Sequence, residues 1–245
     1  MRNRLRQMLA QNLTAGRPIA AVKNATGDGI EVSIYDVIDP WFGVSAASFK
    51  AAIAGAGDAP LTVRINSPGG DVFDGRAIAN MIAQHPGPTT CIVDGLAASS
   101  ASTIAVAAQK TVMADGSMLM VHNAWIMALD NAAGLRQAAD VLDKIDRQIA
   151  ADYARKAKCT LDEALAWMAA ETWFPADEAV TAGLADEVLA VPAKMQNFNL
   201  GAFDRAPQDL LDRIAAAQKP EPNHNFAAMR AAAERRLRLF DHIAA

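Results

Sequence analysis

Two kinds of segment alternate along most of the chain. Short apolar runs rich in β-branched residues, bounded by Gly, Pro, Asn or Asp, predict strands. Longer runs with apolar residues at every third or fourth position predict helices. The first half reads as strand 29–38, helix 45–57, strand 59–67, helix 71–85, strand 89–95, helix 96–109 and strand 110–115. This order predicts an α/β fold with a largely parallel sheet.

The second half continues the pattern and adds one long helix. A strand is predicted over 117–124, followed by a helical pattern over 132–158. At ~1.5 Å per residue such a helix would extend almost ~40 Å. We expect it to project from the domain or to pack against another subunit, with burial inside the monomer as the alternative. The remaining predicted elements are helix 160–170, helix 175–183 and strand 185–189.

The same patterns divide the chain into three parts. Residues 1–27 hold five basic and no acidic residues, which is typical of a flexible basic arm. Residues 28–190 form the main domain. Residues 191–245 contain a polar, Pro-containing stretch and a helix-prone end, so we expect a partly disordered C-terminal appendage with a terminal helix.

Composition limits the functions that this chain can have. Hydrophobic residues make up 52% and charged residues 20% of the 245 residues, and the net charge is −4. These values predict a globular protein without a broad nucleic-acid surface. No apolar run approaches the ~18 residues of a membrane span, and no secretory signal is evident. With two cysteines and no metal-ligand spacing, we expect a cytoplasmic protein with no membrane contact, no metal and no cofactor.

Three serines stand close together in the stretch "VDGLAASSAST", at a predicted strand-to-helix turn. A serine nucleophile needs a nearby base, backbone N–H donors for an oxyanion and room for substrate. The small residues around Ser99 give room, and a helix N-terminus supplies free N–H groups. The alternative is structural: Ser99 and Ser100 would cap the helix, and Ser102 would bond to its own backbone.

Two further features could complete such a site. His122 lies in the apolar strand "MLMVHNA" and is a candidate base near neutral pH, with a satisfied core histidine as the alternative. The segment "SPGGD" holds two glycines between a predicted strand and helix, and these glycines can expose backbone N–H groups. A tight turn is the alternative for that segment.

Four motifs in order resemble the ClpP class of serine peptidases, within it the phage and prophage ClpP-like proteins associated with head maturation. These motifs are "VRINSPGGDVFDGRAIANMI", "DGLAASSAS", "MLMVHNAW" and "ETWFPADEAVTAGLADEV", and the resemblance covers about residues 30–190. It implies a ClpP/crotonase-like α/β fold of repeated β-β-α units with a long projecting helix. It also implies hydrolysis of peptide bonds by a Ser-His-acid triad.

The resemblance assigns the triad residue by residue. Ser99 would be the nucleophile and His122 the general base. The third position falls on Glu171, where the family more often has Asp, and a glutamate can orient an imidazole in some hydrolases. The other acids that could take this role are Asp115, Asp130 and Asp177.

The same resemblance assigns the residues around the triad. The backbone N–H groups of Gly70 and Ser100 would form the oxyanion hole, so that a serine where the family often has Met should not matter. The substrate would bind as an added strand. The residues expected to border it are Gly69, Asp71, Val72 and Phe73. Trp125 would either shape a pocket or pack in the core.

The resemblance also implies partners. It predicts a peptide or protein substrate, and homo-oligomeric rings, usually heptamers, that stack into a double ring through the long helix. An ATP-dependent unfoldase could act as a separate partner, or the enzyme could process phage capsid or scaffold proteins without one.

Three other functions stay open as alternatives to the peptidase. They are a catalytically silent ClpP-fold assembly subunit, a crotonase-type acyl-CoA enzyme, and a serine/lysine hydrolase using Lys110.

Overall fold

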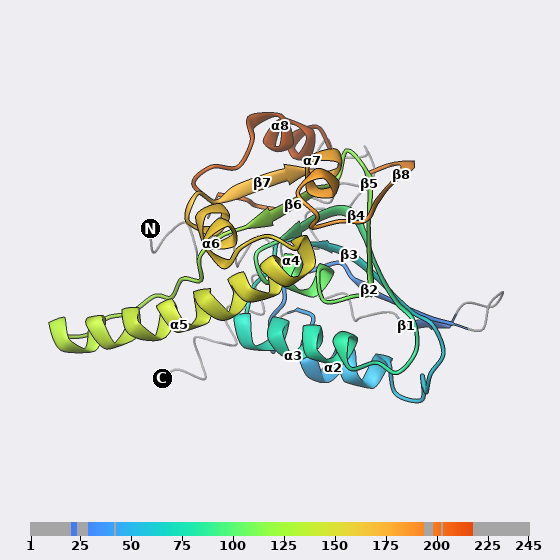
Figure 1. The fold of residues 1–245 in the computed structure, drawn as a ribbon, viewed down its shortest axis with the longest axis horizontal. Coiled ribbons are helices and arrows are strands. Elements are labelled where there is room, and N and C mark those ends of the chain that lie inside the picture. Colours follow the sequence, from blue (N-terminus) through green and yellow to red (C-terminus); the bar gives the residue numbers. More distant parts are fainter. Residues whose placement is uncertain (1–20, 24–28, 42, 194–197, 202, 218–245) are drawn as a thin grey trace, which may run out of the picture.

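The centre of the molecule is a mixed sheet that helices flank (Figure 1). The computed structural model describes residues 21–23, 29–41, 43–193, 198–201 and 203–217. Eight strands join the sheet within these residues: β1 (Ala21–Lys23), β2 (Ile30–Ile34), β3 (Leu61–Ser67), β4 (Thr89–Ala98), β5 (Lys110–Asp115), β6 (Met118–Val121), β7 (Thr172–Pro175) and β8 (Glu187–Pro192). The helices are α2 (Ala46–Ala52), α3 (Val72–Ala83), α4 (Ser100–Ala105), α5 (Ala132–Ala157), α6 (Leu161–Ala169), α7 (Ala176–Thr181) and α8 (Gln208–Ala217).

The strand order confirms the predicted α/β fold. Strands β2, β3, β4, β5 and β8 lie side by side, and each neighbouring pair is parallel. At one edge β1 pairs antiparallel with β2, inside the segment that the sequence predicted as a flexible arm. The rest of that predicted arm, residues 1–20 and 24–27, lies outside the described residues. Off this row of strands, β6 pairs with β4 and β7 pairs antiparallel with β6, and β7 is a strand that the sequence reading missed.

Strand β4 changes its neighbour along its length. Its first part pairs with β5, whereas Leu96, Ala97 and Ala98 pair with Met118, Leu119 and Met120 of β6. The prediction of a helix over 96–109 was therefore wrong at its start, because pairing with β6 extends the strand to Ala98. The helix, α4, begins at Ser100. Ser99 is thus the single residue between a buried strand and a buried helix.

The main core lies between the parallel strands and the helices α2, α3 and α4. In the first five residues of β3, every second side chain is buried, because successive side chains of a strand point to opposite faces. Val63 and Ile65 are fully buried there, and Phe49 of α2 and Ile78 of α3 belong to the same apolar cluster. The core thereby fixes α3 and α4 against the strand ends that carry the candidate site.

A second apolar cluster joins the C-terminal residues to β6 and β7. Leu210 and Ile214 of α8 are buried with Met120 of β6 and Trp173 of β7. Figure 1 shows α8 lying beside β7, at the far end of the molecule from α2 and α3. Within the region predicted as an appendage, the described residues 198–201 and 203–217 therefore pack on the domain. Its predicted terminal helix lies outside the described residues.

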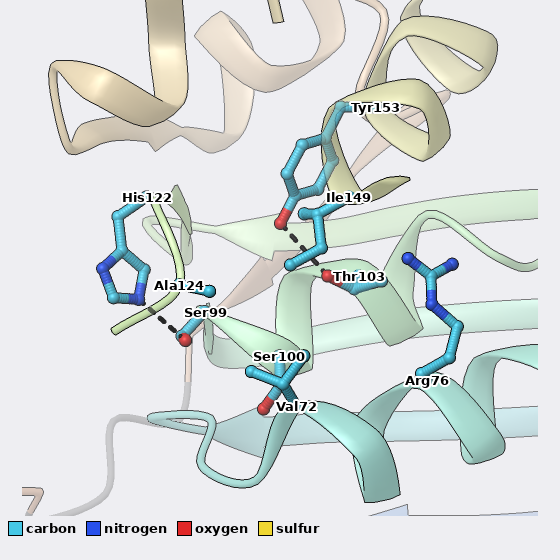
Figure 2. Close-up of a pocket in the computed structure, with 9 residues that line it drawn as sticks. All are labelled: Val72, Arg76, Ser99, Ser100, Thr103, His122, Ala124, Ile149 and Tyr153. Carbon is cyan, nitrogen blue, oxygen red and sulfur yellow. Dashed lines mark hydrogen bonds between the residues drawn. The ribbon is translucent and has the colours of Figure 1, made fainter. Parts of the chain in front are cut away.

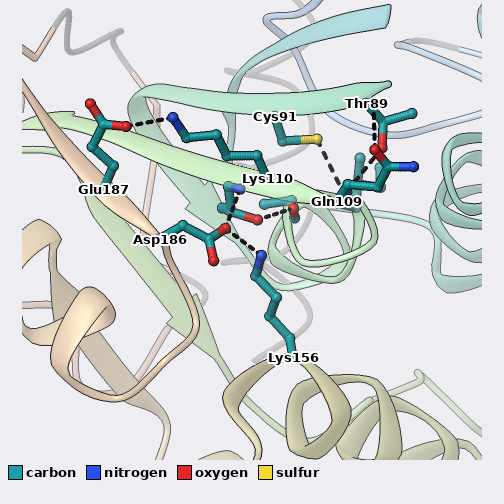
Figure 3. A network of polar contacts seen from close by, with 10 residues as sticks. Thr89, Cys91, Gln109, Lys110, Lys156, Asp186 and Glu187 are labelled. Carbon is teal, nitrogen blue, oxygen red and sulfur yellow. Dashed lines mark hydrogen bonds and ion pairs between the residues drawn. The ribbon is translucent and has the colours of Figure 1, made fainter. Parts of the chain in front are cut away.

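The long helix α5 has a buried half and a projecting half. Ile149 and Tyr153 are buried in the core, and Lys156 Nζ lies 2.5 Å from Asp186 Oδ2, which also accepts the Thr111 N–H (Figure 3). These contacts tie the C-terminal half to β5 and to the turn before β8. The N-terminal half extends away from the domain (Figure 1), which agrees with the predicted projection. Among the described helices, none is long and apolar enough to cross a membrane.

Candidate active site

Ser99 has a strained backbone conformation at the junction of β4 and α4. Its φ is 57° and its ψ is −128°, a combination that L-residues rarely adopt. The backbone at Gly69 packs so closely against this junction that only a glycine fits at position 69. A Cβ on Gly69 would lie 2.5 Å from the Ala98 carbonyl oxygen and 2.7 Å from the Ser99 Cβ. Strain of this kind often marks a functional residue, as in the strand-to-helix turns that present a nucleophilic serine.

The Ser99 hydroxyl bonds to His122 and not to the helix that it precedes. Ser99 Oγ lies 2.8 Å from His122 Nε2 (Figure 2), and no side-chain cap bond to α4 is formed. His122 directly follows β6, and the pairing of Ala98 with Met120 brings the ends of β4 and β6 together. The structural alternative, a helix cap, therefore does not describe Ser99. The two side chains that the sequence singled out lie in contact.

The environment of His122 keeps its imidazole neutral near neutral pH. Burial lowers the pKa of His122 below its ordinary value of 6.5, and the charge of Glu171 partly offsets this by raising the pKa. A neutral imidazole can accept a proton, as a general base must. Phe203 packs edge-on against the His122 ring with the ring centroids 5.5 Å apart. Phe203 was not found in the sequence reading.

Glu171 lies near His122 but directs its carboxylate elsewhere. Oε1 accepts the Arg205 N–H at 2.7 Å and the Trp173 Nε1–H at 3.2 Å, and Oε2 accepts the Asp204 N–H at 3.0 Å. Within the described part of the chain, no hydrogen bond joins Glu171 to His122. Glu171 thus acts on the imidazole through its charge in this structure.

The three alternative acids are not bonded to His122 either. Asp115 ends β5, and its carbonyl oxygen accepts the Ala193 N–H. Asp130 Oδ1 accepts the N–H of Asn131 at the exposed start of α5, and Asp177 is exposed in the first turn of α7. Among the four acids, only Glu171 raises the pKa of His122 through its charge.

The two predicted oxyanion donors, the N–H groups of Gly70 and Ser100, lie in segments that pack against each other. Gly70 has a φ of 149° and forms a bridge with Ile38, in which the Ile38 N–H donates to the Gly69 carbonyl and the Asp71 N–H donates to the Ile38 carbonyl. Within the described residues, the N–H groups of Gly70 and Ser100 donate to no other group. The Ser100 nitrogen lies 3.1 Å from the position of a Cβ on Gly69. Ser100 directly follows Ser99, and Gly69, the neighbour of Gly70, packs against the backbone on both sides of Ser99.

The other two serines have structural surroundings. Ser102 Oγ donates to the Ser99 carbonyl at 2.6 Å and lies 2.7 Å from the Tyr153 hydroxyl, so the expected bond to its own backbone is confirmed. The Ser100 hydroxyl is buried and has no hydrogen-bond partner in the described part of the molecule. Neither side chain contacts His122, so neither is placed to lose a proton to it.

A pocket opens beside the Ser99 hydroxyl (Figure 2). Its lining consists of Val72, Arg76, Ser99, Ser100, Thr103, His122, Ala124, Ile149 and Tyr153. Of the expected substrate-bordering residues, Val72 lines it, whereas Asp71 caps α3 by accepting the N–H groups of Phe73 and Asp74. Phe73 is 71% exposed, and Trp125, 45% exposed, is outside the lining, so Trp125 is not a core residue of the described structure.

Several lining residues were missed by the sequence reading. Arg76 follows Val72 by one helical turn, so the predicted helix itself carried a signal for it. Thr103 belongs to the stretch already singled out, but Ile149 and Tyr153 come from the distant α5. Among the described residues, no group of three or more His, Cys, Asp and Glu side chains could hold a metal ion.

Comparisons with known proteins show the family of the chain. A family model described as Clp protease matches residues 49–192. The chain is 28% identical over 170 residues to the translocation-enhancing protein TepA of Halalkalibacterium halodurans. This match covers 66% of the present chain and 61% of TepA. The chain is 29% identical over 131 residues to an ATP-dependent Clp protease proteolytic subunit of Bacteroides fragilis. This second match covers 53% of the present chain and 63% of that subunit. The matches thus span less than two thirds of the length of these two relatives.

A solved structure gives the same fold. A ClpP1 mutant from Listeria monocytogenes superimposes with a TM-score of 0.58 at 22% sequence identity, covering 65% of this chain and 90% of that chain. The predicted ClpP-like fold is therefore confirmed.

Proposed function

Because the chain belongs to the Clp protease family, we propose that it is a serine endopeptidase in which Ser99 is the nucleophile and His122 the general base. The observation that carries the proposal is the 2.8 Å contact between Ser99 Oγ and His122 Nε2. A serine in a strained strand-to-helix turn, with a neutral imidazole on its hydroxyl, has the parts that nucleophilic catalysis requires.

The proposed reaction is acyl transfer to Ser99 followed by hydrolysis. His122 Nε2 takes the hydroxyl proton as Ser99 Oγ forms a bond to the peptide carbonyl carbon. The N–H groups of Gly70 and Ser100 bind the resulting oxyanion. The tetrahedral intermediate then expels the amine, which receives the proton from His122, and an acyl-enzyme remains. Water, deprotonated by His122, attacks the ester and releases the second product with Ser99 regenerated.

Glu171 is proposed to support the imidazolium that forms in this reaction. Its carboxylate is held by N–H donors of Trp173, Asp204 and Arg205. A fixed negative charge near His122 favours the protonated ring, which is consistent with its effect on the pKa of His122. In this proposal Glu171 is the acid of the site by charge, without a direct hydrogen bond.

Covalent labelling tests the nucleophile. A fluorophosphonate probe is expected to phosphonylate Ser99 in the wild-type protein with loss of fluoride, and digestion with mass spectrometry locates the adduct. Ser99→Ala should abolish labelling. Ser100→Ala is the matched control and should keep it, because the Ser100 hydroxyl is buried without a partner and its removal leaves the backbone N–H in place.

Two results would contradict the proposal. Labelling that persists in Ser99→Ala would place the nucleophile elsewhere. An assembled wild-type protein that resists labelling would instead favour the catalytically silent assembly subunit.

We also propose that the protein forms rings that pair through α5. The projecting start of this helix and the chain before it expose large apolar side chains, with Leu129 99%, Met127 61%, Val141 47% and Leu135 44% exposed. Large apolar side chains that gather on one exposed segment are typical of a protein–protein contact. A second copy of the chain with the same helix is the proposed occupant.

Native mass spectrometry tests this assembly. The wild-type protein is expected to show the mass of a double ring, and Leu129→Glu combined with Leu135→Glu should reduce it to one ring or less. Lys50→Glu, at an exposed position on α2, is the control and should leave the mass unchanged. A wild-type monomer, or no change in the double variant, would contradict the proposal.

The unfoldase partner and the phage substrates expected from the sequence have different support. The Bacteroides fragilis relative is named as the proteolytic subunit of an ATP-dependent protease, which supports an ATP-dependent unfoldase as a proposed partner. Phage capsid or scaffold proteins as substrates, and an association with head maturation, stay predictions from sequence resemblance.

A further inference from the structure

The pocket beside Ser99 changes from apolar to polar along its length. Near its middle it is bordered by the aliphatic side chains of Val72 and Ile149, whereas its end far from Ser99 holds the Arg76 guanidinium and the Thr103 hydroxyl (Figure 2). Thr103 Oγ1 lies 3.3 Å from the Tyr153 hydroxyl. An apolar passage that ends in hydrogen-bonding groups is suited to a side chain with methylene groups and a polar tip.

The depth of the pocket follows from two helices that run along it. Val72 and Arg76 lie one turn apart on α3, and Ser100 and Thr103 lie about one turn apart on α4. In both helices the earlier residue lies nearer to Ser99 than the later residue, which is at the far end (Figure 2). The polar end therefore lies about one helical turn, ~5 Å, from the entrance. Short side chains such as serine or aspartate would not reach it.

Arg76 has hydrogen-bonding capacity left for a ligand. Its Nη1 is bonded to the carboxylate of Asp152 on α5, and Asp152 also accepts a bond from Arg155 Nη2 at 2.5 Å. A guanidinium has five N–H donors, and within the described residues Arg76 makes no other hydrogen bond. Two arginines share one aspartate, so the cluster has a net positive charge. Asp152 fixes the Arg76 side chain while its remaining N–H groups stay available.

On the basis of the proposed peptidase function, we propose that this pocket binds the side chain of the residue whose carbonyl Ser99 attacks, and that it selects glutamine or glutamate at that position. The oxygen of the side-chain amide or carboxylate accepts hydrogen bonds from Arg76 and Thr103. The methylene groups pack between Val72 and Ile149. Arg76 is then a specificity-determining residue that takes no part in the bond-breaking steps.

Apolar side chains of the same length are disfavoured for a physical reason. Leucine or methionine in the pocket would displace water from the Arg76 N–H groups without offering an acceptor. A donor that loses its water and gains no acceptor costs free energy. Sites built to hydrogen-bond a substrate group reject analogues that lack it more strongly than apolar pockets reject a change in size.

The experiment is a fluorogenic peptide library that varies only the residue before the scissile bond. The wild-type protein is expected to cleave the glutamine and glutamate peptides with a kcat/KM at least about tenfold above that of the leucine and methionine peptides. Arg76→Leu should reverse this order, with labelling at Ser99 retained. Asp152→Asn is the matched control, since it breaks the same ion pair but keeps the guanidinium. It should preserve the preference and raise glutamate relative to glutamine.

The outcomes separate the two proposals. A wild-type preference for leucine or methionine, or an order that Arg76→Leu leaves unchanged, overturns the pocket assignment while the peptidase proposal stands. If Arg76→Leu does not fold, Thr103→Val replaces it. This variant should lower the ratio of kcat/KM for the glutamine peptide to kcat/KM for the leucine peptide, and an unchanged ratio counts against the assignment. Absence of both turnover and labelling at Ser99 overturns the peptidase proposal, and the pocket assignment with it.

Discussion

Replacing Ser99 or His122 with alanine is expected to lower kcat for a peptide substrate by about 10⁶-fold, and replacing both is expected to cause no further loss. The reason is that each side chain works only through the other. Without Ser99 there is no hydroxyl for the imidazole to deprotonate, and without His122 the hydroxyl is a weak nucleophile. The 2.8 Å contact between Oγ and Nε2 is the geometric basis for this dependence.

The measurement is a double-mutant cycle on kcat with one fluorogenic peptide. The four proteins are wild type, the two single variants and the double variant, each compared at equal folded concentration by circular dichroism. Losses that multiply in the double variant would mean that the two residues act independently, which contradicts the proposed pair. Activity that remains in the double variant is expected to come from the Gly70 and Ser100 N–H groups and from substrate binding.

Local sequence made Ser99 and His122 candidates, and the family resemblance assigned their roles. Each directly follows a largely apolar strand, and strand ends carry the functional residues of α/β sheets. What the sequence did not reveal is that β4 continues through Leu96 to Ala98. Small apolar residues fit a buried strand as well as a buried helix. The pairing with β6, which is a tertiary contact, decides between the two.

The pocket depended on contacts that local patterns do not specify. Tyr153 and Ile149 come from α5, and their periodic spacing predicted a helix face without indicating what that face covers. Packing of α5 against α4 places them beside Ser99, and it also brings Asp152 to Arg76. The polar end of the pocket is therefore a property of the folded chain, although the helices that form it were predicted.

The surroundings of Glu171 illustrate the same limit. The resemblance selected this residue, but its hydrogen-bond partners Asp204 and Arg205 lie in the segment that the sequence described as an appendage. Those bonds are made by backbone N–H groups, which carry no sequence signal. Phe203 joins the same arrangement by packing against both His122 and Trp173. The C-terminal segment thereby supports two of the three proposed triad residues.

Replacing Glu171 with glutamine is expected to lower the plateau of kcat/KM by about 10²–10³-fold, the usual size of the loss when one electrostatic support of a transition state is removed. The glutamine has no charge to stabilise the His122 imidazolium. The carboxylate of Glu171 accepts hydrogen bonds from backbone N–H groups, whereas the NH₂ group of a glutamine can only donate. Residues 203–205 therefore lose part of the hydrogen bonding that holds them. The loss should stay below the ~10⁴-fold that follows when a directly hydrogen-bonded acid is neutralised.

The pH profile gives a second readout for the same variant. Catalysis needs neutral His122, so kcat/KM rises with pH through the pKa of this residue, which burial has lowered below 6.5. Glu171 raises that pKa, and the glutamine variant should therefore show its rise at lower pH than wild type. Glu171→Asp, which keeps the charge, and Trp173→Phe, which removes a single N–H donor, are the controls and should shift the profile less.

Two outcomes would contradict this role of Glu171. A loss of ~10⁴-fold or more in Glu171→Gln would indicate a direct bond between Glu171 and Nδ1 of His122 during turnover. Wild-type activity with an unshifted profile would transfer the role to Asp115, Asp130 or Asp177.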